Sequence, residues 1–321
     1  NFIKAWQIPM HIHTLVTTTD PYTFKDGIWG NSTPTLNETY RKYDQYTWQG
    51  SLNYARAFGK NSITALALFE GIENNYHIMK AGRKNYSMFI DELDMGSSSA
   101  ADISNSGTST LARQLGLVYR LSYDYDHKYL LETSGRYDGH YYFAPGKKWG
   151  FFPSVAMGWR MSEENFIREN FGSVDNLKLR ASYGEVGALA GGAFQYLNTY
   201  SAYGPAHAFD GSAVNAFRER AEANNNITWE RARKTDIGLE LGLWKGLLNI
   251  EVDYFYEKRS NMLVTPDVTV PSEYGIGLSQ VNKGIMENHG IDLNLGSTYK
   301  LSSDLQFSLN GTFTYARNKL L

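Results

Sequence analysis

The run Leu111-Ala-Arg-Gln-Leu-Gly-Leu-Val-Tyr-Arg-Leu-Ser-Tyr-Asp-Tyr125 alternates between two kinds of side chain. Its odd-numbered positions are apolar or aromatic except for Arg113, and its even-numbered positions are mostly small or polar. Successive side chains of a β-strand point to opposite faces of a sheet, so a period of two predicts one long strand. One face of this strand is apolar and the other is polar.

The same alternation recurs along the whole chain. Ten runs carry it, at residues 51–58, 62–70, 111–125, 129–138, 151–160, 177–184, 236–243, 248–257, 291–296 and 305–315. One or two further strands are expected within residues 1–15 and 84–95. Short turns alternate along the chain with long segments. The short turns are at 59–62, 124–128, 244–246 and 298–303, and the long segments are at 71–110, 185–233 and 258–288. The sequence therefore predicts an all-β protein with short connections at one end of its sheet and long loops at the other.

Composition excludes several classes of protein. The charge is balanced, with 31 basic and 33 acidic residues, and the basic residues form no stripe, so no nucleic-acid partner is expected. No cysteine is present, which excludes disulfide scaffolds and thiolate metal sites. No apolar run approaches the ~18 residues of a transmembrane helix. Glycine, at 30 residues, and tyrosine, at 23, are frequent while proline, at 8, is scarce, which favours extended strands.

Half-apolar strands occur in soluble β-sandwiches and in transmembrane β-barrels. The runs here reach well beyond the usual ~5–6 residues, which suits a tilted membrane crossing. Tyrosine and tryptophan gather near strand ends, as in the aromatic girdles of outer-membrane barrels. The polar faces carry charges at mid-strand, which a water-filled or plugged lumen accepts. These observations favour a transmembrane antiparallel β-barrel in a lipid bilayer, with lumen-facing Arg120, Arg136, Arg160, Arg180 and Asp253.

One turn differs from the rest. Residues 161–175 are expected to form a short helix with Ser162 as its N-cap, at the end of the sheet where the connections are short. On this side a barrel of the bacterial outer membrane faces the periplasm.

Residues 111–316 resemble the C-terminal half of SusC/RagA-type TonB-dependent outer-membrane transporters. The resemblance is carried by the order and spacing of short motifs, among them Arg136-Tyr-Asp-Gly139, Phe152-Pro-Ser-Val155, Gly158-Trp-Arg160, Val174-Asp-Asn-Leu-Lys-Leu-Arg-Ala-Ser-Tyr-Gly184, Asn226-Ile-Thr-Trp-Glu230 and Asn282-Lys-Gly-Ile-Met-Glu-Asn-His-Gly290. Residues 1–110, where long loops dominate, resemble the family only in general character and carry none of these motifs.

The resemblance implies a barrel of twenty-two strands, of which residues 1–321 would be about half, the C-terminal portion. It implies a plug domain and a TonB box outside this chain, and a last strand that ends on an aromatic residue, whereas this chain ends at Leu321. It also implies import of glycans or peptides, with a SusD-like surface lipoprotein over the extracellular mouth and energy delivered through TonB.

No catalytic site is expected. The carboxylate pairs Glu163-Glu164 and Asp124/Asp126 lie in predicted turns or caps. Acidic side chains are common at such solvent-exposed positions, so these pairs need no role in acid–base catalysis. His11 and His13 share a strand face but have no third ligand nearby, so neither a metal nor any other cofactor is expected. No nucleophile elbow or phosphate-binding loop is present.

The loops at 139–149 and 185–233 are the candidate ligand-binding regions, because aromatic faces stack on sugars while amides and carboxylates supply directional hydrogen bonds. The candidates are Tyr141, Tyr142, Phe143, Gln195, Tyr196, Tyr200, Tyr203, Asp210 and Trp229. These aromatic residues could instead pack the loops together or against a lipoprotein lid. Two further alternatives stay open for the whole chain, namely a passive porin-like or structural barrel and a soluble β-rich glycan-binding protein.

Overall fold

The computed structural model describes residues 1–16, 24–30 and 32–321, and it divides into two compact units. Unit 1 comprises residues 1–47 and 72–113, and unit 2 comprises residues 48–71 and 114–321. No helix among the described residues is long and apolar enough to cross a membrane.

One antiparallel sheet of eleven strands dominates the chain, in the order β1-β4-β5-β6-β7-β8-β9-β12-β13-β14-β15. The strands are β1 (Phe2–Gln7), β4 (Thr35–Phe58), β5 (Asn61–Lys84), β6 (Ile103–Tyr125), β7 (Tyr129–His140), β8 (Trp149–Arg160), β9 (Val174–Ala188), β12 (Glu230–Leu243), β13 (Leu248–Val264), β14 (Val281–Lys300) and β15 (Gln306–Leu320). Two separate hairpins are β2 (Met10–Leu15) with β3 (Phe24–Trp29), and β10 (Tyr200–Phe209) with β11 (Ser212–Glu219).

All ten predicted runs lie in strands of the large sheet, and β1 adds the eleventh. The expected strand at 84–95 is wrong, because that segment ends β5 and then forms the 3-10 turn η1 (Leu93–Met95). The long segments were predicted too broadly, since β5 extends to Lys84 and β6 begins at Ile103. Residues such as Glu73, Asn74 and Asn75 are polar on both faces, so the alternation is lost where the strand continues.

Unit 1 is a small packed region around the first strand. Residues Phe2–Gln7 pair antiparallel with β4, and the side chain of Leu36 is fully buried. The Trp6 ring lies edge-on to Tyr86 at 4.7 Å and to Phe89 at 5.3 Å between ring centroids. Lys4 forms an ion pair with Glu38 at 3.0 Å.

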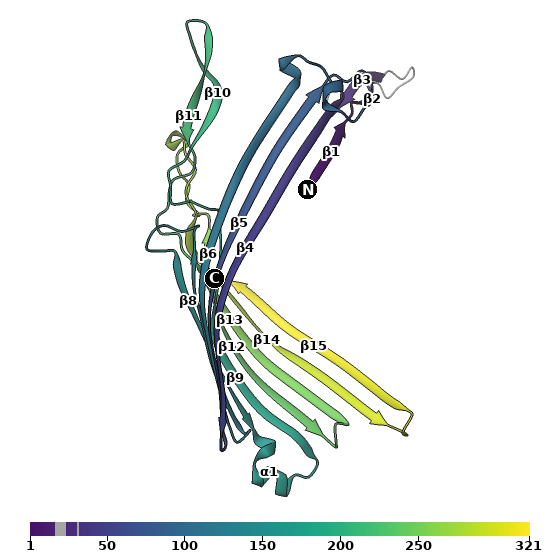
Figure 1. Cartoon of the computed structure of the whole chain (residues 1–321), viewed down its shortest axis with the longest axis vertical. Coiled ribbons are helices and arrows are strands. Elements are labelled where there is room, and N and C mark those ends of the chain that lie inside the picture. The colour runs from purple at the N-terminus through teal and green to yellow at the C-terminus, as the bar shows by residue number, and fades with distance from the viewer. Residues whose placement is uncertain (17–23, 31) are drawn as a thin grey trace. The chain divides into compact units, whose positions relative to one another are not determined.

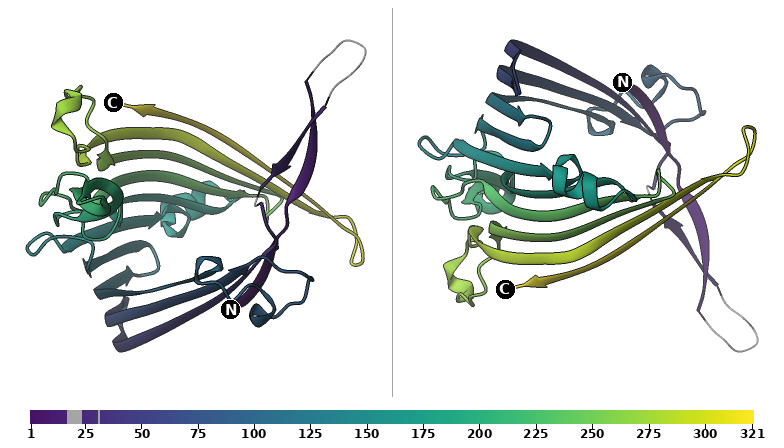
Figure 2. Two further views of the ribbon diagram at one scale, coloured as in Figure 1. Left: turned by 90° about the horizontal axis from the view of Figure 1, so that it is seen from above. Right: turned by 90° about the horizontal axis from the view of Figure 1, so that it is seen from below.

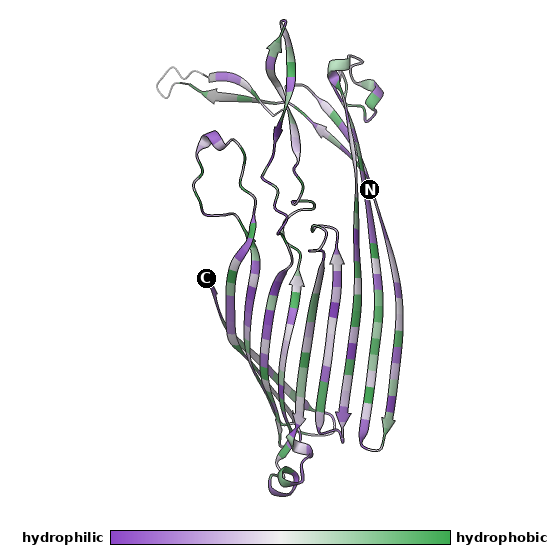
Figure 3. Ribbon diagram, turned by 90° about the vertical axis from the view of Figure 1, so that its left-hand side faces the viewer, coloured by the Kyte–Doolittle hydropathy of each residue, from purple (hydrophilic) through white to green (hydrophobic). Residues whose placement is uncertain are grey.

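In unit 2 the register aligns side chains of one kind across several strands. One row, Trp159, Leu179, Leu239, Val252 and Leu293, is apolar. The adjacent row, Gly158, Arg180, Gly238, Asp253 and Asp292, is small or charged. We call the two sides of the sheet the apolar face and the polar face. Figure 2 shows β12–β15 side by side in one curved layer, and green and purple bands alternate along them in Figure 3.

Large apolar side chains remain exposed on the apolar face, among them Leu239 at 38%, Ile291 at 45% and Tyr254 at 46%. Only nine apolar side chains are buried among the described residues, so the sheet is not one half of a filled sandwich core. Lipid is the environment that such a face requires.

Aromatic rings border the apolar face at both ends of β7 and β8. Tyr129 stacks on Trp159 with ring centroids 6.4 Å apart, and Tyr137 stacks on Trp149 at 4.9 Å. Tyr129 and Tyr137 are separated by about 27 Å along the strand, or about 20 Å in height at a typical ~40° tilt, close to the apolar band of a barrel. The predicted girdles are therefore present at this part of the sheet.

The connection after β8 closes the end of unit 2 that has the short turns (Figure 1). It consists of the 3-10 turn η3 (Met161–Glu163) and helix α1 (Asn165–Asn170). The prediction that Ser162 is the N-cap is wrong, because Ser162 is a buried residue of η3. Glu164 occupies the N-cap position and accepts hydrogen bonds from Tyr129 Oη at 2.6 Å and from Trp159 Nε1 and Lys128 Nζ, each at 3.2 Å.

Candidate functional site: the polar face and the loop end of unit 2

A cluster of charged side chains occupies the polar face around Arg180. The guanidinium lies 2.6 Å from Asp253, 2.7 Å from Glu251, and 3.3 Å from both Asp236 and Glu240. These carboxylates come from β12 and β13, so register alone brings them to one arginine of β9. Lys178 adds a second cation at 2.9 Å from Glu240. The cluster concentrates negative charge on a wall with little apolar surface.

Glycine makes room for this charged layer. A Cβ atom at Gly238 would lie 2.1 Å from Asp253 Oδ1 and 2.8 Å from Arg180 Cζ. Gly116 similarly leaves space for the Arg136 side chain, which pairs with Asp138 at 2.9 Å and with Glu70 at 3.6 Å. The small residues of the polar face therefore lie beneath the long charged residues of neighbouring strands.

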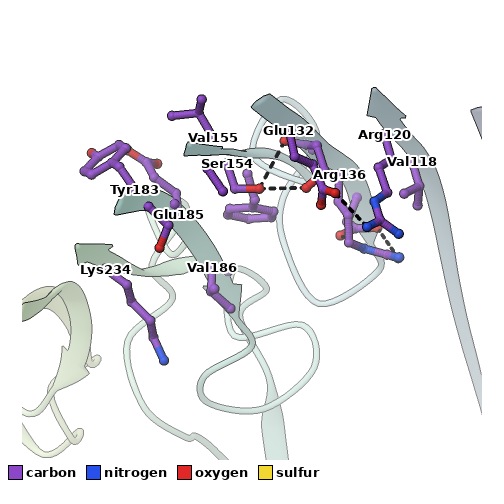
Figure 4. A pocket seen from close by; sticks show the side chains of 18 of the residues that line it. Val118, Arg120, Glu132, Arg136, Ser154, Val155, Tyr183, Glu185, Val186 and Lys234 are labelled. Atoms are coloured by element: carbon purple, nitrogen blue, oxygen red, sulfur yellow. Dashed lines mark hydrogen bonds and ion pairs between the residues drawn. The ribbon is translucent and has the colours of Figure 1, made fainter. Parts of the chain in front are cut away.

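A cavity of about 770 Å³ follows the polar side of β6–β9 and reaches Lys234 of β12. Arg120 and Ser122 both donate to Glu132, at 2.6 Å and 2.9 Å, and the hydroxyls of Ser134 and Ser154 lie 2.6 Å apart. In Figure 4 the side chains of Arg120, Glu132 and Arg136 lie close together along this wall. The lining offers hydrogen bonds and both signs of charge.

The four predicted lumen-facing arginines and Asp253 all belong to the polar face by register. Arg120 is paired with Ser134, Arg136 with Phe152, and Arg180 with Gly158. Arg160 is the last residue of β8 and is paired in register with Lys178. Arg180 and Asp253 contact each other, whereas Arg120 and Arg136 belong to the cavity wall further along the sheet.

The opposite end of unit 2, where the connections are long, has an aromatic core. Phe143, Phe152, Ile227 and Trp229 are buried together, with Tyr142 and Leu263 packed against them. Trp229 Nε1 donates to the carbonyl of Lys148 at 3.0 Å. Phe143 and Trp229 were candidates for stacking on a ligand, but they are only 1% and 7% exposed. In this structure they hold the loops together, the alternative that the sequence left open.

Tyr141 and Tyr196 retain partly exposed rings beside this core. The Tyr141 ring lies 5.6 Å from Phe194, and Phe194 lies 6.2 Å from Tyr196. Burial raises the pKa of the Tyr141 hydroxyl, and the neighbouring Tyr142 adds to that shift. Gln195 instead joins two loops, because its amide nitrogen donates to Gln280 Oε1 at 3.1 Å and its oxygen accepts from the Gly192 backbone.

The remaining candidates belong to the β10–β11 hairpin, which the sequence had assigned to a loop. Tyr200 and Tyr203 are exposed strand residues, and Arg218 lies over the Tyr203 ring at 5.5 Å. Asp210 has a φ of 48° and lies in the turn with Gly211. The structure thus places Tyr200, Tyr203 and Asp210 in the β10–β11 hairpin, which Figure 1 labels, and not in the group of Tyr141, Phe194 and Tyr196.

Sequence reasoning missed several contributors to the site. Asp236, Glu240 and Glu251 lie within the predicted alternating runs 236–243 and 248–257, but they could not be identified as partners of Arg180, because the pairing depends on the register of three strands. Phe194 and Gly238 were not singled out. A long side chain opposite a glycine on a polar face is the signal that could have identified Gly238.

Comparison with known proteins agrees with this architecture. Residues 6–320 match the family model described as TonB dependent receptor-like, beta-barrel. A TonB-dependent receptor of Formosa agariphila is 31% identical over 221 residues, covering 68% of this chain and 20% of that protein. The TonB-dependent receptor SusC of Bacteroides thetaiotaomicron is 26% identical over 319 residues, covering 96% of this chain and 30% of that protein.

Solved structures show the same fold. The RagAB peptide transporter superposes with a TM-score of 0.81 at 21% identity, over 99% of this chain and 33% of the matched chain. The outer membrane transporter YddB of Escherichia coli gives a TM-score of 0.59 at 12% identity, over 99% of this chain and 39% of the matched chain. The chain spans between 20% and 39% of the length of these proteins.

The alternating register, exposed apolar face and charged polar face define a transmembrane β-barrel wall. The chain belongs to the TonB-dependent receptor-like β-barrel family, and its homologues include SusC. It is therefore an outer-membrane protein, with its apolar face toward lipid and its polar face toward the lumen. This placement excludes the soluble alternative.

Proposed function

We propose that residues 1–321 are the C-terminal part of the barrel of an importer that takes up glycans or peptides by TonB-dependent transport. The family match over residues 6–320 supports this proposal most directly. The proposed protein includes a plug domain and a TonB box outside this chain, and the work of transport is conformational, without bond chemistry or a cofactor.

The polar face fits such a role in two ways. Its charged side chains are arranged in ion pairs. They can form hydrogen bonds with a solute without creating a single site of very high affinity. Asp253 Oδ1 and Arg180 Nε are buried without a hydrogen-bond partner among the described residues, although Nε lies 3.3 Å from Glu240. Water or a plug domain within the lumen would supply the missing partners.

We further propose that Tyr141 and Tyr196 contact the solute, and that the β10–β11 hairpin contacts a SusD-like surface lipoprotein. Stacking on an aromatic ring contributes about 0.5–1.5 kcal/mol beyond burial. Tyr200 and Phe209 of the hairpin are 64% and 68% exposed, an apolar surface that a protein partner would cover.

The test is uptake by cells that carry the full-length protein. Labelled oligosaccharides and labelled peptides are offered with and without a protonophore, and the double variant Tyr141→Ala, Tyr196→Ala is compared with Tyr254→Leu on the apolar face. We expect uptake of one solute class to stop with the protonophore and to fall several-fold in the double variant only. Protonophore-insensitive uptake would instead favour a passive porin-like barrel.

A further inference from the structure

One buried histidine lies beside the aromatic core at the loop end of unit 2. His140 is the last residue of β7 and comes after the aromatic border of the apolar face, so it lies outside the membrane-spanning part of the strand. The residue is only 8% exposed. The centroid of its ring lies 4.8 Å from that of Tyr141, 4.5 Å from that of Tyr142 and 6.2 Å from that of Trp229. A titratable ring is therefore enclosed by three aromatic rings.

Hydrogen bonds fix both the ring and the backbone of His140. The backbone N–H of Tyr142 donates to His140 Nδ1 at 3.3 Å, so Nδ1 carries no proton in this arrangement and the imidazole is neutral. The backbone N–H of His140 donates to the carbonyl of Lys148 at 3.1 Å. Because the same carbonyl accepts the hydrogen bond from Trp229 Nε1, one acceptor joins His140 to the aromatic core.

The surroundings of His140 provide no free carboxylate for a positive charge. The charged and titratable side chains of the elements around it are those of Asp138 and Arg136 in β7, the phenols Tyr141 and Tyr142, and Lys148. Both carboxylate oxygens of Asp138 already accept from Arg136. The register partner of His140 on β6 is the uncharged Gln114. Burial therefore lowers the pKa of His140, and no charged side chain among the described residues adds to that shift.

Protonation is incompatible with this arrangement of His140. A proton on Nδ1 would point at the N–H of Tyr142, so that two donors would meet where one hydrogen bond now exists. A buried imidazolium without a carboxylate partner also loses the hydration that stabilises its charge in water. Both effects favour an arrangement in which the ring reaches water and segment 141–148 leaves the aromatic core.

We propose that His140 is an acid-sensitive switch, which holds segment 141–148 against the aromatic core while it is neutral and releases the segment when it is protonated. The stabilisation is complete above the ordinary histidine range, and it is lost as the pH falls through the lower value in the folded protein. Tyr141 belongs to the released segment. Withdrawal of its ring from a transported solute is a consequence that rests on the proposed function, whereas the release itself does not.

The experiment measures amide hydrogen exchange by mass spectrometry in the full-length protein in detergent micelles. Rates at about pH 7.5 and about pH 5 are compared after correction for the intrinsic pH dependence of exchange. The test variant is His140→Asn, because asparagine Oδ1 can accept from the Tyr142 N–H in place of Nδ1 and does not titrate. The matched control is His127→Asn, since the His127 side chain is 79% exposed in a turn at the opposite end of unit 2.

We expect peptides that cover residues 141–148 and 222–229 to exchange about tenfold faster at the acidic pH in the unaltered protein and in His127→Asn, as loss of a buried hydrogen bond implies. In His140→Asn the change should stay below about twofold. Peptides of β12–β14 should remain protected throughout, which shows that the sheet is folded. Loop-end peptides are measured separately from those of the turn end, so titration of Glu164 does not interfere.

Equal acceleration in His140→Asn, or no acceleration in the unaltered protein, would overturn the proposal. Slower exchange at the acidic pH would also overturn it, because it would mean that cation–π attraction from the surrounding rings stabilises the imidazolium. If His140→Asn fails to fold, the His140 ring is titrated by NMR in the unaltered protein, and a pKa at or above the ordinary histidine value would contradict the switch. Uptake is not measured, so failure of the import proposal leaves this result unaffected.

Discussion

Gly238 illustrates how a single residue permits the polar face to form. Its missing side chain leaves the space that Asp253 and Arg180 occupy. Gly238→Ala should displace this pair and lower the free energy of unfolding by about 1–3 kcal/mol, the usual cost of overpacking. The control is Gly158→Ala in the same row, where the nearest atom to a new Cβ lies 3.4 Å away. Comparable destabilisation of both variants in urea would contradict the assigned packing.

Val252 tests which face meets lipid. It lies between Leu239 and Leu293 on the apolar face, so Val252→Arg should cost about 2–4 kcal/mol in folding into bilayers. Glu251 would be a poor control because it binds Arg180 at 2.7 Å. Asn294 is paired with Glu251 on the polar face, and Asn294→Arg should cost much less. Equal losses of folding free energy in the two variants, measured by reversible folding, would mean that the apolar face is wrongly assigned to lipid.

At the residue scale, the sequence predicted which residues share a face of the sheet, but it did not predict which side chains contact each other. Period-two alternation was sufficient to assign Arg180 and Asp253 to one face. It could not reveal that Arg180 contacts Asp236, Glu240 and Glu251, because those contacts depend on which strands are neighbours and in which register. Likewise, exposed and buried aromatic residues in the loops have no sequence signature, so Phe143 was not distinguished from Tyr141.

Among the elements, the connection formed by η3 and α1 is held to the sheet through Glu164. Its hydrogen bonds from Tyr129, Trp159 and Lys128 keep the pKa of the Glu164 carboxyl below its ordinary value. A lowered pKa means that this stabilisation is complete above the usual carboxyl range and is lost as the pH falls through the lower value. Acidification should therefore change the fluorescence of Trp159.

The Glu164→Gln variant should lose that pH dependence, because a neutral amide does not titrate. Glu163→Gln is the matched control, since Glu163 contacts Arg168 and none of the three Glu164 partners. An unchanged acid transition in Glu164→Gln would show that another group is responsible.

Element lengths show where prediction from sequence failed. The ten alternating runs located the membrane-level parts of the strands, because there one face must be apolar. Beyond that level the alternation of β5 and β6 is lost, and side-chain contacts such as Arg113 with Glu73 at 2.7 Å and His77 with Ser109 at 2.9 Å accompany the pairing of the two strands. The β10–β11 hairpin was missed because its exposed strands have no consistently buried face.

The β10–β11 hairpin should be dispensable for the barrel and required for the proposed lipoprotein partner. Replacing residues 200–219 with a short Gly-Ser linker should leave outer-membrane insertion unchanged and should abolish co-purification of the lipoprotein. The control replaces residues 141–148, which include the buried Phe143 and should disturb the loop core instead. Retention of the lipoprotein without the hairpin would exclude it as the principal contact.

At the scale of the whole molecule, a single sheet separates lipid on its apolar face from the lumen on its polar face. The eleven strands of the large sheet equal half of the number that the resemblance implied. The family match supports the same architecture through an independent route. Glycan or peptide specificity stays a proposal, because the loops that would determine it follow no periodic rule.

The most direct test uses the absence of cysteine from this chain. Single cysteines are introduced along β14 at Ile291, Leu293 and Leu295, and at Asp292, Asn294 and Gly296, and outer membranes are treated with a water-soluble maleimide. We predict labelling at positions 292, 294 and 296 and protection at positions 291, 293 and 295. Uniform labelling, or the reverse alternation, would contradict a lipid-facing apolar side and a water-filled lumen.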